Sequence, residues 1–472
     1  MRKTLRTVIM VTAPLASLMT LALGLRIGAE AGVHAVSVTA TPRSPSVSRA
    51  YLRLTAYYDE TGVKETVELT ELVVNVRLRD ADQTSITSTN TDGIIDVPVE
   101  LPADLADDED IQVRVNRKAE PYPLVEGRIK ASVLAPEKST EPLGYRALRP
   151  TKQIGDITVD LSLPDGRLPA EANTRAFVRM RVNGAPPSNP KVELAPEGGM
   201  DGSVVRVCTK EGVAELSLVA TFPITGIGVV VTDGDGANKK RGEWFGAVPV
   251  AMGAPRVQLP ASEPANVPFH VDIRASNARA GVYVVVDDAK GRAFTDYKPL
   301  HVTTSGAESA TVDVPALPEG LYFLTASGDP KAIDALDSSA VARPFLVRET
   351  PPDACSLLDS LTPAAGPTKR TPVLDGLYVR RQGDRQKKRR GLFLGILSLT
   401  VAALLEVVLL FSAAKDARAD LAARMSEVLD DDEARGIDAD EKRSSGLSRM
   451  AVAVLIALLG FALIGAFVIW RV

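Results

Sequence analysis

The acidic run at positions 107 to 110 is the densest group of side chains in this sequence that could do acid–base chemistry. It reads Asp107-Asp108-Glu109-Asp110 and follows Pro102 in a segment of loop composition. Glycoside hydrolysis needs two carboxyl groups held about 5–10 Å apart across the scissile bond. Four neighbours in one loop are more typical of solvated surface. An enzyme on a β-sandwich scaffold is therefore the weakest of three hypotheses, and we predict no enzymatic activity and no catalytic residue.

Metal chemistry has one weak candidate in the segment DGDGAN, which begins at Asp233. It resembles the start of a calcium loop, but its glycines occupy the second and fourth places, and Trp244 stands at the twelfth, where a bidentate Glu is required. The segment therefore predicts a β-turn, with adventitious Ca²⁺ as the alternative. The three histidines are far apart in the chain, which does not indicate a zinc site or a catalytic triad. We predict no metal and no cofactor. These histidines are His34, His270 and His301.

The elements that would position any site are predicted to be short antiparallel strands. Between Gly32 and Val347 the sequence alternates strand-like runs with turns, as in Leu72–Leu78 (LVVNVRL), where every second residue is apolar. Turn pairs such as Asp92-Gly93 and Asn183-Gly184 accept the positive φ that hairpins require. Strands at this spacing without intervening helices favour antiparallel sandwiches, so the predicted fold class is mainly β.

Linker composition divides this region into three modules of roughly 100 residues, the size of an immunoglobulin-type sandwich. A stretch containing Ala135-Pro136-Glu137-Lys138 ends the first module, and Pro255 opens the third. The predicted boundaries are 32–134 for module 1, 135–153 for a linker, 154–252 for module 2 and 255–348 for module 3.

Two short stretches resemble bacterial immunoglobulin-like and macroglobulin-type modules. Thr89–Val97 (TNTDGIIDV) is similar to a hairpin in which a T-x-D-G turn precedes an alternating strand, and Leu317–Leu324 (LPEGLYFL) is similar to a late G-x-Y strand. The resemblance implies tandem Ig-like β-sandwich domains that bind or space a partner, and it carries over no catalytic residue. The Cys-Gly-Glu-Gln thioester motif of macroglobulin protease traps does not occur in the sequence.

The first apolar block predicts export. Residues 1–31 have a basic start, an uncharged and mostly apolar run from Val8 to Leu25, and small residues at Ala29-Glu30-Ala31. This is the pattern of a signal peptide, although about 18 apolar residues also suffice to span a bilayer. Cleavage after Ala31 and retention as a signal anchor are both open, and both place the following segment outside the cytoplasm.

Two further apolar blocks predict a C-terminal transmembrane hairpin. Residues 391–411 and 450–470 each contain about 21 residues, roughly 31 Å of helix, which matches the hydrocarbon core of a bilayer. The intervening segment, 412–449, predicts an acidic cytoplasmic helical loop. Glu406 lies within the first predicted span, and it is either a helix-contact residue inside the membrane or a side chain that reaches the interface.

Residues 349–390 predict a Pro-rich stalk followed by a basic juxtamembrane segment. The basic cluster should lie against anionic headgroups, where each cation contributes about 1 kcal/mol. This arrangement puts the cluster on the extracytoplasmic side of the membrane, which contradicts the positive-inside tendency. The alternative topology inverts the transmembrane hairpin and places the β region in the cytoplasm. The cluster consists of Arg385, Lys387, Lys388, Arg389 and Arg390.

The two cysteines, Cys208 and Cys355, exclude a framework of several disulfides. One long-range bridge between them and a pair of unlinked thiols are both open.

The formal net charge of −4 gives no electrostatic case for nucleic-acid binding. The leading hypothesis is a non-enzymatic protein of a bacterial-type cytoplasmic membrane, with a periplasmic or extracellular Ig-like ectodomain that binds or spaces a partner. The alternative is a transmembrane regulatory or signalling subunit that relays an ectodomain event through the hairpin. Expected partners are membrane lipids and a protein in a membrane complex, and small-residue pairs in the last span also allow helix–helix self-association.

Overall fold

The computed structural model describes the chain from Gly32 to Ser426 with short gaps. The described residues fall into a sandwich unit, Val36–Tyr57 and Thr66–Gly376, and a helical unit that contains Tyr58–Glu65 and the chain from Leu377 onward. The described ranges are 32–60, 62–118, 120, 122–136, 144–235, 239–275, 280–302, 308–330, 333, 339–350, 352–361 and 370–426.

The first sandwich has two antiparallel sheets that face each other across one core. One sheet has the order β28-β1-β2-β3, with β6 also paired to β2, and the other has the order β5-β4-β7-β8. Leu52 and Val97 of one sheet and Val113 of the other are all buried in this core. The elements are β1 (Gly32–Thr41), β2 (Arg49–Glu60), β3 (Val63–Thr66), β4 (Leu72–Leu78), β5 (Ala81–Thr87), β6 (Ile94–Glu100), β7 (Asp110–Arg117), β8 (Val125–Lys130), the 3₁₀ helix η1 (Ala131–Leu134) and β28 (Thr371–Asp375).

Strand β28 belongs to this sheet, although in the sequence it comes after both of the other sandwiches. It pairs antiparallel with β1, with Val38 opposite Leu374. The prediction of a Pro-rich stalk over 349–390 is therefore wrong for these five residues. Leu374 packs against the core of the first sandwich, so its burial outweighs the Pro-rich composition on which the stalk prediction depended. The second and third sandwiches are thus inserted between β8 and β28.

The second sandwich packs a sheet of order β10-β18-β17-β14, to which β12 adds in parallel, against one of order β15-β16-β13-β11-β9. Its core is shared by both sheets and includes the fully buried Trp244. The predicted linker 135–153 contributes β9 and part of β10, which are too short to show an alternating pattern. The strands are β9 (Tyr145–Ala147), β10 (Lys152–Gly155), β11 (Ile157–Pro164), β12 (Leu168–Pro169), β13 (Thr174–Val182), β14 (Pro190–Glu197), β15 (Met200–Cys208), β16 (Val213–Ala220), β17 (Ile224–Asp233) and β18 (Lys240–Ala251).

The third sandwich has sheets of order β19-β21-β25-β24 and β20-β27-β26-β22-β23. With β19 as the first strand, this is the ABED and GFC arrangement of the immunoglobulin fold. Tyr322 near the start of β26 donates its hydroxyl to the Pro318 carbonyl (3.1 Å), as in a tyrosine corner. The strands are β19 (Arg256–Gln258), β20 (Ser262–Glu263), β21 (Phe269–Arg274), β22 (Gly281–Asp287), β23 (Arg292–Pro299), β24 (His301–Val302), β25 (Glu308–Val314), β26 (Gly320–Ser327) and β27 (Val341–Val347).

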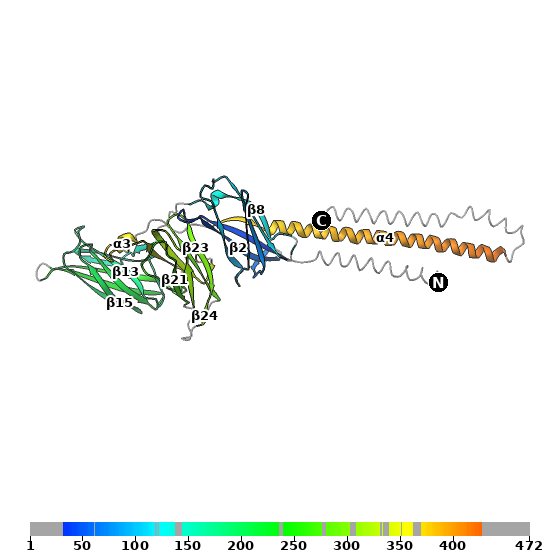
Figure 1. The fold of residues 1–472 in the computed structure, drawn as a ribbon. Helices are drawn as coiled ribbons and strands as arrows, with labels where there is room; N and C mark the ends of the chain where they lie inside the picture. Colours follow the sequence, from blue (N-terminus) through cyan, green and yellow to red (C-terminus); the bar gives the residue numbers. More distant parts are fainter. Residues whose placement is uncertain are drawn as a thin grey trace. The chain divides into compact units, whose positions relative to one another are not determined.

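Local sequence explains these strands. In β4 the apolar residues at alternate positions are buried, as period-2 alternation requires of a strand with one face on a core. Asn183 and Gly184 both have positive φ, and Val182 and Ala185 on either side form an antiparallel bridge, as in a two-residue hairpin turn. The mainly β, Ig-like fold class predicted from the sequence is confirmed. Figure 1 shows the three sandwiches through labelled strands such as β2, β13 and β21.

Among the described residues after the third sandwich, the structure has a short helix, α3 (Leu357–Ser360), and a long one, α4 (Leu377–Ser426) (Figure 1). Helix α4 contains residues 391–411, the first predicted membrane span. Within the described part of the chain, no helix reaches both the length and the apolar character that a membrane crossing requires. The predicted signal segment 1–31 and the predicted last span, 450–470, lie outside the described residues, as does most of the predicted loop 412–449 beyond Ser426.

Candidate functional site

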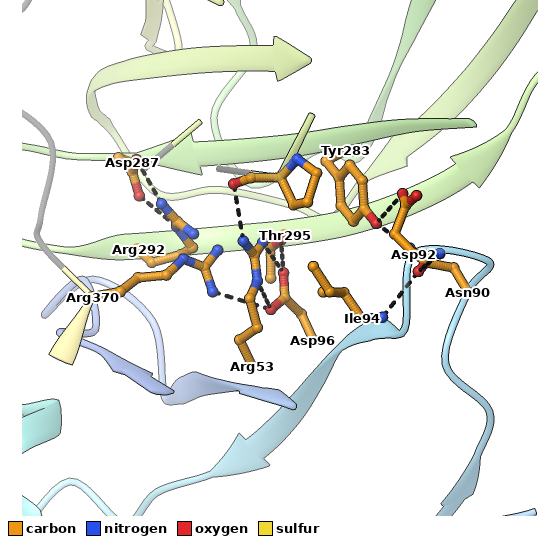
Figure 2. A network of polar contacts seen from close by, with 11 residues as sticks. Arg53, Asn90, Asp92, Ile94, Asp96, Tyr283, Asp287, Arg292, Thr295 and Arg370 are labelled. Carbon is orange, nitrogen blue, oxygen red and sulfur yellow. Dashed lines mark hydrogen bonds and ion pairs between the residues drawn. The ribbon is translucent and has the colours of Figure 1, made fainter. Parts of the chain in front are cut away.

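A buried polar network joins the first and third sandwiches (Figure 2). Antiparallel pairing of β2 with β6 places Arg53 directly opposite Asp96. Arg370, one residue before β28, and Thr295 of β23 also reach the carboxylate of Asp96. The return of the chain to the first sandwich at β28 brings Arg370 beside Arg53 and Asp96.

Asp96 is held by four side-chain hydrogen bonds. Arg53 binds it with two parallel bonds, Nε to Oδ1 and Nη2 to Oδ2, both 2.8 Å long. Arg370 Nη1 donates to Oδ1 at 3.1 Å, and Thr295 Oγ1 donates to Oδ2 at 2.7 Å. The side chains of the three charged residues are only 5–7% exposed. A two-bond guanidinium–carboxylate contact in such surroundings is both strong and geometrically specific.

The electrostatics of Asp96 follow from this geometry. Burial by itself would raise the pKa of the carboxyl group, but the positive charges of Arg370 and Arg53 and the hydrogen bonds from Arg53 and Thr295 outweigh it. The pKa of Asp96 is therefore held well below its usual range, and the carboxylate stays ionised at neutral pH.

This depressed pKa predicts an acid-sensitive joint. A carboxyl group whose pKa is lower in the folded state stabilises the fold above its unfolded pKa of about 4, and that contribution is lost as the pH falls below this value. Between pH 4 and pH 2 we expect the stability difference between the wild type and Asp96→Asn to shrink by about 1.4 kcal/mol per pH unit. Denaturant titrations of both proteins at several pH values measure it, and a difference independent of pH contradicts it.

The loop that joins β5 of one sheet to β6 of the other, where the sequence resembled a hairpin, carries a second contact of the same joint. The side-chain oxygen of Asn90 accepts hydrogen bonds from the backbone N–H groups of Asp92 and Ile94, which fixes the loop. Tyr283 of β22 then donates its hydroxyl to Asp92 Oδ2 at 2.9 Å and also contacts Asn90. Burial and the Asp92 contact raise the pKa of Tyr283. The Arg53 guanidinium lies 5.8 Å from the centre of the Tyr283 ring, a cation–π contact.

A third contact is made by backbone. Ser44 N donates to the Arg292 carbonyl at 2.9 Å, and Arg292 N donates to the Pro42 carbonyl at 2.8 Å. A Cβ on Gly291 would lie 2.1 Å from the Arg43 carbonyl oxygen, so only glycine permits this approach. The Arg292 side chain, 2% exposed, is paired with Asp287 at 2.8 Å.

These groups fasten two domains together, because each ionised side chain of the network is already bound to an opposite charge or a hydrogen-bond partner. Sequence reasoning missed this network entirely. The signal that could have found part of it is a charged residue inside an otherwise apolar strand, as at Arg53 in AYLRLTA and Asp96 in IIDVPV. Thr295, Tyr283 and Arg370 give no such signal, because their contacts depend on how the sandwiches meet.

The structure joins Cys208 and Cys355, predicted as either a bridge or two thiols, in a disulfide with a Cα–Cα distance of 5.5 Å. Cys208 ends β15 of the second sandwich, and Cys355 precedes α3. Leu357 and Leu358 of α3 pack against Phe177 of the second sandwich, in a cluster that also contains Leu346 of the third. This part of the predicted stalk is therefore attached to the second sandwich, a second departure from the extended stalk.

We expect the disulfide to be visible in the migration of the denatured chain. It closes a loop of 147 residues, so the oxidised chain is more compact when unfolded and should migrate faster in non-reducing than in reducing electrophoresis. Cys208→Ser and Cys355→Ser should each abolish the difference to the same extent. Equal migration of the oxidised and reduced wild type would contradict the bridge.

The other residues singled out in the sequence lie elsewhere. Glu406 and the whole basic cluster are on α4, where Arg385, Arg389 and Arg390 are exposed. The side chains of Glu406, Lys387 and Lys388 lie outside the described residues.

Two carboxylates of the acidic run at positions 107 to 110 form ion pairs on the protein surface. Glu109 contacts Arg79 at 2.6 Å, and Asp110 contacts Lys130 at 2.8 Å. In the segment suspected of binding calcium, Asp233 ends β17, where it accepts a hydrogen bond from the backbone N–H of Asn189 at 2.6 Å. Each of these three carboxylates thus has a partner within the chain.

The chain matches no family model and no curated protein. Among solved structures it is similar to a point mutant of Salmonella α2-macroglobulin, with 13% identity and a TM-score of 0.16, over 68% of this chain and 24% of that one. This chain thus spans about a quarter of that protein's length.

It is also similar to a three-domain I-band fragment of titin, with 9% identity and a TM-score of 0.14, over 67% of this chain and 98% of the fragment. A chimeric titin tandem matches at 12% identity and a TM-score of 0.14, over 44% of this chain and all of that one. These neighbours agree with the resemblance to Ig-like and macroglobulin-type modules noted in the sequence. TM-scores this low carry no argument about fold or function.

Proposed function

We propose that this protein is a non-enzymatic, membrane-anchored envelope protein whose three Ig-like sandwiches form a binding or spacer ectodomain. The observation that carries the spacer role is the network around Asp96. Its hydrogen bonds from Thr295 to Asp96 and from Tyr283 to Asp92 cross from the third sandwich to the first. A spacer that holds a partner at a fixed distance needs stiff joints of this kind, whereas independent modules on a flexible chain do not. The disulfide between Cys208 and Cys355 also supports a stiff ectodomain, because it attaches the segment after the third sandwich to the second sandwich.

Membrane attachment is supported by the sequence. Residues 391–411 carry one charged side chain in 21 positions, and residues 450–470 carry none. The exposed arginines at 385, 389 and 390 of α4 directly precede the first of these runs, where cations attract anionic headgroups. The export pattern of residues 1–31 supports a location of the sandwiches outside the cytoplasm. Within a membrane complex, lipids and a protein partner are the expected contacts.

Fractionation of cells that express the full chain tests the attachment. We expect the protein to stay in the membrane pellet after extraction with alkaline carbonate, and protease added to intact spheroplasts should digest the sandwiches. Release of the protein into the carbonate supernatant would contradict anchoring. Full protection of the sandwiches in intact spheroplasts, with digestion after lysis, would support the inverted topology instead.

A regulatory or signalling subunit is the second candidate, and one observation favours it. Helix α4 begins at Leu377, immediately after Gly376, and continues for 50 residues without a break. Within the helical unit, Arg381 Nη2 donates to Asp59 Oδ1 at 2.6 Å, and the side chain of Asp59 is 1% exposed. Deletion of residues 413–433 distinguishes the candidates. A spacer keeps its function when membrane insertion is intact, whereas a relay loses it.

A further inference from the structure

A cavity of about 320 Å³ lies where the second and third sandwiches meet. Tyr145, Arg175 and Glu215 of the second sandwich line it, together with Arg343 of β27 in the third. This volume is at the lower end of the range for small-molecule sites. The cavity is distinct from the network around Asp96, which joins the first and third sandwiches.

The charges that line this cavity do not cancel. Arg175 Nε donates to Glu215 Oε1 at 2.6 Å, so these two residues neutralise each other. The only other charged residue of the lining is Arg343, and the described part of the chain places no carboxylate within ion-pair distance of it. Burial lowers the pKa of Arg343 to about 10, which reflects a guanidinium that has lost hydration without gaining a counter-charge. The lining therefore keeps one positive charge.

Arg343 has the hydrogen-bonding capacity to receive an anion. Its Nη1 donates to the Val257 carbonyl at 2.8 Å, and its Nη2 is buried without a hydrogen-bond partner among the described residues. Elsewhere in this chain the Nε and Nη2 atoms of an arginine together hold a carboxylate, as Arg53 holds Asp96 and Arg292 holds Asp287. Among the described residues, no carboxylate takes that position at Arg343.

We propose that the cavity binds a small organic acid, whose carboxylate accepts hydrogen bonds from the Nε and Nη2 atoms of Arg343. A monoanion fits because the lining has a single uncompensated cation, and a small molecule fits because of the volume. The remaining lining is mixed, with the Tyr145 ring and Pro260 on the apolar side and Asn173 and Ser217 on the polar side. Binding there would involve both sandwiches, since Arg343 and Glu215 come from different ones.

Benzoate and benzamide form a matched pair of probes, because they have nearly the same shape and differ in charge. Calorimetric titration of the full chain in mild detergent should give saturable binding of one benzoate, with benzamide at least about tenfold weaker. Equal affinity for the two probes, or no saturable heat from benzoate up to about 10 mM, would overturn the proposal. This comparison needs no variant, and its outcome does not depend on whether the protein is a spacer or is anchored in a membrane.

Variants place the site at Arg343. Arg343→Met should lower benzoate affinity by at least about tenfold, and Arg343→Lys, which keeps the charge but not the two-bond contact, by a smaller factor. Arg348→Met is the matched control, since Arg348 is exposed just after the same strand and should leave affinity unchanged. Unaltered benzoate binding by folded Arg343→Met overturns the assignment. If that variant does not fold, Arg343→Lys and the benzamide comparison decide.

Discussion

Asp96→Asn should destabilise the protein by about 3–5 kcal/mol, because it removes the charge that compensates two buried arginines. Asparagine has nearly the shape of aspartate, so packing is kept while the negative charge beside Arg53 and Arg370 is removed. Both guanidinium groups are held by the sandwich architecture at 2.8 and 3.1 Å from this carboxylate. Denaturant unfolding of the purified wild type and variant, monitored by circular dichroism at pH 7, measures the difference.

Asp82→Asn is the matched control within the same sandwich. Asp82 faces Arg77 across β4 and β5 at 3.6 Å, but both side chains are more than half exposed. An exposed pair of this kind contributes about 0–1 kcal/mol, so the control should unfold almost as the wild type does. Equal effects of Asp96→Asn and Asp82→Asn would show that the buried network contributes no more to stability than an exposed ion pair does.

Gly376→Ala should destabilise the first sandwich by about 3 kcal/mol or more, because a Cβ at this position has no room. It would lie 1.7 Å from the carbonyl oxygen of Leu124 and 3.0 Å from that of Val36. Both neighbours are backbone atoms, so no side-chain rotation relieves the clash. Gly376 N also donates to the Val36 carbonyl at 2.9 Å, directly after β28. The substitution therefore tests whether β28 closes the first sandwich.

A strand glycine with room around it provides the comparison. An added Cβ on Gly226 of β17 would meet its nearest neighbour, Phe245 Cζ, at 3.5 Å, an ordinary contact. Gly226→Ala should change the unfolding free energy by less than about 1 kcal/mol, in either direction. Thermal unfolding followed by near-ultraviolet circular dichroism compares the two variants. If Gly376→Ala is as well tolerated as Gly226→Ala, residues 371–376 do not pack as described.

The sandwiches themselves could be predicted from local pattern. Alternation such as LVVNVRL at Leu72–Leu78 and turn pairs such as Asn183-Gly184 depend on neighbours in sequence, and they identified mainly β, Ig-like modules. The stretch Thr89–Val97, which carried the family resemblance, contains the loop between β5 and β6 whose Asn90 and Asp92 contact Tyr283. Its role at the joint could not be inferred, because that depends on a strand almost 200 residues away.

The insertion of two sandwiches into the first could not be predicted for the same reason. Thr371–Asp375 contains a proline and follows a Pro-rich stretch, so composition favours an exposed linker. Pairing with β1, 335 residues or so earlier, is a long-range event that five residues do not specify. Arg370 gains its buried position only through that pairing, and Arg343 faces its cavity only because two sandwiches meet. Local sequence thus identifies the modules, whereas the joints and cavities between them come from tertiary packing.

The fixed relation between the first and third sandwiches can be measured by pulsed electron resonance between two spin labels. Ile86→Cys of β5 and Arg274→Cys of β21 are exposed attachment sites, and the native cysteines are occupied by their disulfide. A stiff joint predicts one narrow distance distribution in the full chain, which broadens when Asp96→Asn is added. A broad distribution in the otherwise wild-type chain, unchanged by Asp96→Asn, would contradict the proposal that these domains form a rigid spacer.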